Sequence, residues 1–135
     1  MLAEPGVVYP LLAVAGAARR DGWRGACGPC LVVASGAAAR RRLSRVIARQ
    51  RPPAEAWLIE PEGFSLPSKH TALAALAAGA CVRALGGRGA AARAAPALAA
   101  AAVGTSRVYL GVHWPADVVA GWLVAEGWLR RTAPD

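Results

Sequence analysis

The sequence has little lysine and few aromatic residues, and both shortages restrict what the chain can be. Lys69 is the only lysine among 16 basic residues, although the formal net charge is +8. The arginines lie at the edges of apolar runs and not along one helical face, which disfavours a nucleic-acid partner. One Phe and two Tyr are few for β-strands, in which alanine, about a quarter of this chain, is also depleted. We therefore expect an all-α protein.

No uncharged run reaches the roughly 18–20 residues of an ideal transmembrane helix. The runs cover residues 5–18, 25–39, 71–82, 94–106 and 118–125. Flanking arginines can lengthen such runs by laying their aliphatic stems along lipid. We expect a membrane helical bundle, with a soluble bundle as the alternative. A cleaved signal peptide is disfavoured, because residues 1–6 contain Glu4 and no lysine or arginine.

Proline and glycine divide the chain into about five helices, in a single domain over residues 1–135. The stretch 51–53 contains two prolines and stops the second helix, and three glycines in the stretch 86–89 stop the third. The segment 53–66 is a loop whose length favours a functional role. The predicted helices are residues 6–18, 26–49, 67–86, 90–108 and 115–130.

The cysteines do not indicate a cofactor. Cys27-Gly28-Pro29-Cys30 matches the redox pair of thioredoxin-like proteins, but that chemistry needs a preceding strand, and no β-pattern precedes it here. Cys81 lies in an alanine-rich helix and is expected to be buried. Three cysteines without paired histidines do not form a zinc site. We expect neither a metal nor a cofactor.

Two histidines are present, and each lies beside a predicted helix start. A lone histidine is more often structural than catalytic, but two with polar neighbours favour chemistry. Asp117 falls in the first turn of the helix that begins at Pro115, from where its carboxylate can reach back. It would keep one imidazole nitrogen of His113 protonated and leave the other free to attack. His113 is the predicted nucleophile, and His70 the predicted acid for the leaving group.

These residues resemble the three-part signature of the phosphatidic acid phosphatase type 2 and vanadium haloperoxidase superfamily. The third element (Ser-Arg, five residues, His, three residues, Asp) is complete at Ser106, Arg107, His113 and Asp117. The second and first elements match in part, at Pro67, Ser68 and His70 and at Arg51-Pro52. Two positions differ: Lys69 replaces the usual glycine, and Ser44, followed by Arg45, replaces the usual lysine.

In-line phosphoryl transfer also needs cations around the phosphate oxygens. Arg51 and Arg107 are the predicted clamp. Ser68 is the predicted N-cap, so that the amides after it, including that of Lys69, face the anion. Lys69 or Arg45 is predicted to supply the charge that Ser44 lacks; the alternative is that Lys69 points to solvent and the enzyme is weak.

The resemblance implies a membrane phosphatase that hydrolyses a lipid phosphate or diphosphate, of the phosphatidate or prenyl class, through a phosphohistidine. Its partners would be the lipid substrate and membrane lipids. An inactive homologue and a vanadate-dependent haloperoxidase are the alternatives. The arginine-rich turns place the active site at the extracytoplasmic face of the cell membrane. The arginine cluster 40–42 contradicts this orientation, because it lies on the same side of the membrane as the active site.

Overall fold

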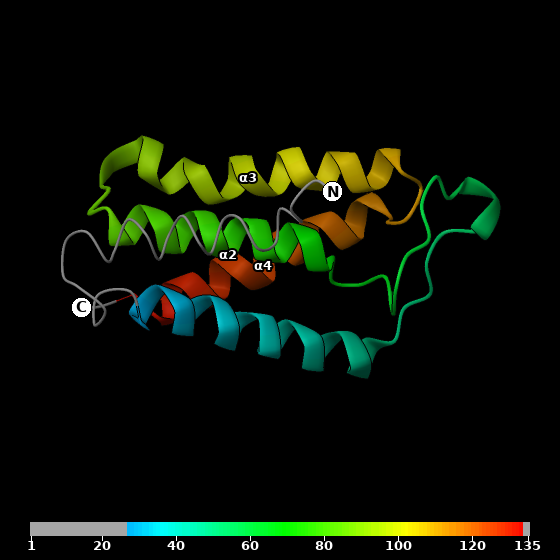
Figure 1. Cartoon of the computed structure of the whole chain (residues 1–135), viewed down its shortest axis with the longest axis horizontal. Coiled ribbons are helices and arrows are strands. Elements are labelled where there is room, and N and C mark those ends of the chain that lie inside the picture. The colour runs from blue at the N-terminus through cyan, green and yellow to red at the C-terminus, as the bar shows by residue number, and fades with distance from the viewer. Residues whose placement is uncertain (1–26, 134–135) are drawn as a thin grey trace.

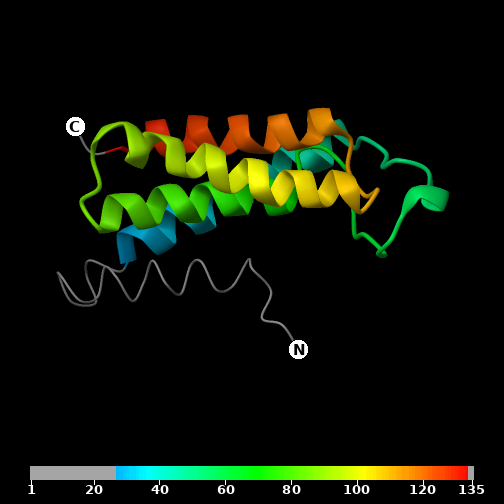
Figure 2. The same cartoon turned by 90° about the horizontal axis from the view of Figure 1, so that it is seen from above.

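The computed structural model describes residues 27–133, and these residues form a bundle of helices. A helix over residues 27–47 comes first, and a loop containing the 3-10 turn η1 (Ala54–Ala56) follows it. The three labelled helices are α2 (Lys69–Ala84), α3 (Gly89–Tyr109) and α4 (Pro115–Arg131). Figures 1 and 2 show all four helices lying side by side. No strand occurs in the described part, which confirms the all-α class; it holds four helices, and the predicted helix 6–18 lies outside it.

The helix boundaries agree with the prediction to within two residues, and the end of the first described helix has a cause of its own. That helix ends at residue 47, before the prolines that were expected to stop it. Ala48 adopts a left-handed conformation with φ of 48°, and its N–H donates to the carbonyl of Ser44 at 2.9 Å. A left-handed residue at this position ends a helix by closing its last turn. α3 continues through Pro96.

Small residues form much of the core and set how closely the helices approach. The buried core contains Val33, Ala75, Leu76, Ala80, Ala100, Ala125 and Leu129. A Cβ atom on Gly104 of α3 would lie 2.1 Å from Cγ1 of Val118, and one on Gly121 would lie 2.8 Å from the carbonyl of Ser68. These two contacts press the end of α3 and the start of α2 against the first turns of α4. The motif residues are therefore brought to one end of the bundle.

The outer surface of the bundle carries large apolar side chains. Leu31, Val46, Leu98, Val119 and Leu123 are each more than half exposed. Among the helices of residues 27–133, none has a stretch that is both long and apolar enough to count as a candidate membrane span.

The cysteines differ in part from expectation. Cys27 and Cys30 are exposed and free in the first turn of the helix 27–47. Cys81 is only partly buried, so its expected full burial is wrong. Its neighbours Ala80 and Ala77 take the core positions of α2.

Candidate active site

The predicted site residues meet where the loop between residue 47 and α2 lies against the α3–α4 turn (Figure 1). A cavity of about 510 Å³ opens at this end of the bundle. Five of the seven predicted site residues line it: Arg51, Lys69, His70, Arg107 and His113. The other two, Ser68 and Asp117, are fully buried. Four segments far apart in the sequence thus contribute to a single site.

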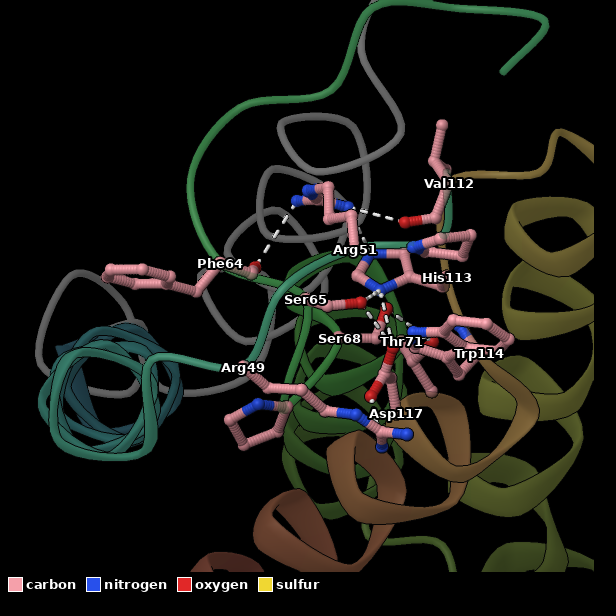
Figure 3. A network of polar contacts seen from close by, with 12 residues as sticks. Arg49, Arg51, Phe64, Ser65, Ser68, Thr71, Val112, His113, Trp114 and Asp117 are labelled. Carbon is pink, nitrogen blue, oxygen red and sulfur yellow. Dashed lines mark hydrogen bonds and ion pairs between the residues drawn. The ribbon is translucent and has the colours of Figure 1, made fainter. Parts of the chain in front are cut away.

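The imidazole of His113 is buried, and its two nitrogens have different surroundings (Figure 3). Nε2 lies 3.3 Å from Nη1 of Arg51. Nδ1 lies 3.5 Å from Oδ2 of Asp117 and 3.4 Å from Oγ of Ser65. A guanidinium can only donate, so Nε2 accepts this bond and the ring proton lies on Nδ1. This is the tautomer expected for attack by Nε2.

The surroundings of His113 also set its charge. The pKa of His113 is lowered from 6.5 to about 4. Burial is the largest cause, the charge of the Arg51 guanidinium comes next, and His70 adds a smaller effect, whereas Asp117 raises the pKa. Burial likewise lowers the pKa of Arg51, while Asp117 raises it. The imidazole is therefore neutral at physiological pH, which is the form that a nitrogen nucleophile requires.

The carboxylate of Asp117 is held on both oxygens, by two residues that the motif analysis missed. Arg49 Nη1 donates to Oδ1 at 3.0 Å, and the Arg49 guanidinium lies 5.9 Å from the ring centroid of Trp114. The Trp114 N–H donates to Oδ2 at 2.9 Å and caps α4, and the hydroxyl of Ser65 makes a short hydrogen bond to the same oxygen. Ser65 is itself fully buried. Nothing in the local sequence pattern singled out Ser65 or Arg49.

Arg51 is bound mainly by backbone. Its Nη1 donates to the carbonyl of Val112 at 2.7 Å as well as to His113. Its other donors go to three consecutive carbonyls of the loop, those of Glu62 at 2.7 Å, Gly63 at 2.9 Å and Phe64 at 3.3 Å. The side chain therefore ties the loop to the α3–α4 turn beside Nε2 of His113. Its role as a phosphate clamp stays a prediction, and it requires exchange of some of these bonds.

Arg107 differs from Arg51 in having a donor to spare. It lies in the last turn of α3 and lines the cavity. Its Nε is buried and has no hydrogen-bond partner within residues 27–133. A buried guanidinium N–H without a partner is expected to attract an anion. Of the two predicted clamp residues, Arg107 is the one that has an N–H group available for an anion without first breaking a hydrogen bond.

Ser68 occupies the N-cap position of α2, but its side chain makes no capping hydrogen bond, which corrects the expectation. Its Oγ accepts from Oγ1 of Thr71 at 3.0 Å, and its N–H donates to the carbonyl of Asp117 at 3.0 Å. Ser68 therefore joins α2 to α4. The adjacent Lys69 is exposed and lines the cavity, as does Arg45.

Ser44, at the position of the family's lysine, lies beside the side chain of another cation, Arg40. Ser44 is 5% exposed, and Nη2 of Arg40 lies 3.4 Å from its Oγ. The same guanidinium donates through Nε to the Pro67 carbonyl at 2.8 Å. Both residues line the cavity, together with Arg41. In the part of the chain that the structure describes, no three His, Cys, Asp or Glu side chains gather as a metal site.

The fold and the site together define an all-α protein with two histidines in a cation-lined cavity. The family model of the PAP2 superfamily matches residues 25–133, and the chain belongs to that superfamily. The resemblance seen in the sequence is thereby confirmed.

One solved structure and one curated protein are similar to the chain. The crystal structure of a transmembrane PAP2-type phosphatidylglycerolphosphate phosphatase from Bacillus subtilis aligns with a TM-score of 0.74 and 29% identity, over 96% of this chain and 68% of that one. A segment of 22 residues, 16% of this chain, is 73% identical to an undecaprenyl-diphosphatase from Sulfolobus acidocaldarius and spans 11% of that protein. Both of these proteins are phosphatases by name.

Proposed function

We propose that the protein hydrolyses a lipid phosphate or diphosphate through a phosphohistidine formed on His113. The observation that carries this proposal is the orientation of the imidazole, which has Nε2 beside Arg51 at the cavity and Nδ1 toward Asp117. Nε2 attacks phosphorus as the bond to the leaving oxygen breaks, and His70 donates a proton to that oxygen. Water then attacks phosphorus with His70 as the base, which releases phosphate and restores Nε2.

The apolar features of the molecule support a lipid as the substrate and a membrane as its location. Ile59 and Phe64 are 41% and 43% exposed and line the same cavity as the histidines. An acyl or prenyl chain can follow such side chains while its phosphate reaches the arginines. The outward apolar side chains of the helices and the transmembrane neighbour agree with a multi-pass protein of the cell membrane. We further propose that the cavity faces the extracytoplasmic side.

A direct test is release of phosphate by the detergent-purified chain from phosphatidate, phosphatidylglycerolphosphate and a prenyl diphosphate. We expect His113→Asn to abolish release, and Arg131→Gln, an exposed arginine outside the cavity, to retain it. Brief incubation with ³²P-labelled substrate should label the wild type with an acid-labile, base-stable phosphate, and should not label His113→Asn. Release by His113→Asn at the wild-type rate would refute the assignment of the nucleophile.

Ser44 favours a second candidate, a weak or inactive homologue that binds phosphate without turnover. The two candidates separate in a vanadate-binding measurement beside the hydrolysis assay. An active phosphatase binds vanadate and is inhibited by it, whereas the inactive homologue binds it and releases no phosphate from any of these substrates.

A further inference from the structure

We infer that Ser65 is a positioning residue, whose hydroxyl links the Asp117 carboxylate to Nδ1 of His113. The inference rests on the proposed function and assigns a role to a residue outside the family signature found in the sequence. Ser65 is fully buried in the loop before α2, with its Oγ between the two side chains in Figure 3. It does not touch the position that a substrate would take at Nε2.

The direction of each hydrogen bond follows from which groups can donate. Asp117 is held by the Arg49 cation and accepts on both oxygens, so the Ser65 hydroxyl donates its proton to Oδ2. The lone pairs of that hydroxyl are then free to accept. Nε2 of His113 accepts from Arg51, which leaves the proton on Nδ1 facing Oγ at 3.4 Å. The chain of bonds therefore runs from Nδ1–H to Ser65 and from Ser65 to Asp117.

The acceptor sites on Asp117 explain why a link is needed. Oδ2 already accepts the Trp114 N–H at 2.9 Å and the Ser65 hydroxyl, and Oδ1 accepts from Arg49. Nδ1 of His113 lies 3.5 Å from Oδ2 and 3.4 Å from Ser65 Oγ, so its proton faces both acceptors. Of these two acceptors, Ser65 Oγ is the one that has unused lone pairs. The serine thus acts together with the carboxylate to hold the proton on Nδ1.

The link acts during attack on phosphorus. As Nε2 forms its bond, positive charge develops on the ring and strengthens the Nδ1–H bond to Ser65. The hydroxyl passes this polarisation to Asp117, and no proton has to leave Nδ1. Removing the hydroxyl should slow the chemical step and leave substrate binding unchanged, because no binding contact is lost.

The test compares Ser65→Ala with Ser65→Cys, which is close to serine in size, and with Ser35→Ala. Ser35 is the control because it bonds Trp128 at 3.1 Å, away from the cavity. We expect Ser65→Ala to lower kcat about 10- to 100-fold, since a lost hydrogen bond to a charged network has that size, with KM within twofold. Ser65→Cys should lie between, and Ser35→Ala should match the wild type. Wild-type kcat in Ser65→Ala would overturn the inference.

A second measurement does not depend on turnover. With ¹⁵N-labelled histidine, His70→Gln leaves His113 as the sole imidazole, and its spectrum reports which nitrogen holds the proton. We expect the Nδ1–H tautomer in that background and a mixture once Ser65→Ala is added. The charged groups that face His113 and influence its titration in this variant are Asp117, Arg51 and, behind the carboxylate, Arg49. If the tautomer is unchanged the link is refuted, whereas a wild type without any hydrolysis refutes the proposed function alone.

Discussion

The lowered pKa of His113 predicts an unusually acidic limb in the pH dependence of hydrolysis. The limb in kcat/KM reports the pKa of the free enzyme's nucleophile. We expect kcat/KM to hold down to a pH of about 4, well below the usual histidine value of 6.5. Burial and the Arg51 guanidinium are the two main causes of the lowered pKa. Substitution can separate them, because Arg51→Gln removes the charge but keeps a long side chain that still shields the site from solvent.

The distance in the structure gives the size of the effect. Arg51 Nη1 is 3.3 Å from Nε2. With the screening of water, which sets a lower limit for a buried ring, a unit charge at that distance disfavours protonation by about 1.3 kcal/mol, or about 1 pH unit. In Arg51→Gln the limb should move from a pH of about 4 to about 5 or above. It should not reach 6.5, because burial is the larger cause and remains.

The assay is the kcat/KM profile from pH 3.5 to 8 for wild type, Arg51→Gln and Arg51→Lys. The substrate's own phosphate ionisation is common to all three proteins and cancels in the comparison. Arg51→Lys keeps a charge near Nε2 but loses the fork that binds the loop carbonyls, so we expect a lower rate with the limb still close to 4. The electrostatic reasoning fails if the two variants have the same limb, or if the limb moves down in Arg51→Gln.

Three further predictions follow from other features of the site. Lys69→Ala should lower turnover much more than Arg131→Ala. Equal effects would refute the prediction that Lys69 supplies a positive charge to the phosphate. Gly111 has a φ of 72°, and a Cβ there would lie 1.8 Å from a backbone oxygen of η1. Gly111→Ala should therefore destabilise the fold by roughly 1–3 kcal/mol in thermal unfolding, unlike Gly28→Ala, which meets nothing within 4 Å. Because the pKa of His113 is lower in the folded than in the unfolded chain, the unfolded chain binds the proton first, and the free energy of unfolding should fall as the pH drops from 6.5 toward 4. In His113→Gln this part of the dependence of the unfolding free energy on pH should vanish. An unchanged dependence would contradict the assignment.

The sequence predicted those parts of the site that depend on local order. His70, Arg107 and His113 each lie at or beside a helix end, where spacing along the chain and spacing in the fold coincide. The superfamily and the helix start at residue 115 followed from the same local signals, and the start of α2 was predicted two residues early. That these motif residues share one cavity was implied by the resemblance to the superfamily, and the structure places them there.

The residues that were missed act across long separations. Ser65 meets Asp117 at 52 residues along the chain, and Arg49 meets it at 68. Such pairs depend on how the loop folds back onto α4, and a buried serine carries no periodic or charge signal of that contact. The expected Ser68 cap failed for a related reason, since the hydroxyl of Thr71 and the backbone of α4 occupy its hydrogen-bonding groups.

The arginine cluster 40–42 shows why charge counted along a sequence differs from charge placed in space. Consecutive helical residues point about 100° apart, so three adjacent arginines cannot share one environment. Arg40 is 9% exposed and reaches inward to the Pro67 carbonyl, Arg41 lines the cavity, and Arg42 faces outward. Two of the three charges that opposed the predicted membrane orientation therefore line the cavity. Arg40 also lies one helical turn before Ser44 and beside its hydroxyl, so a positive charge lies close to this position although the residue itself is uncharged.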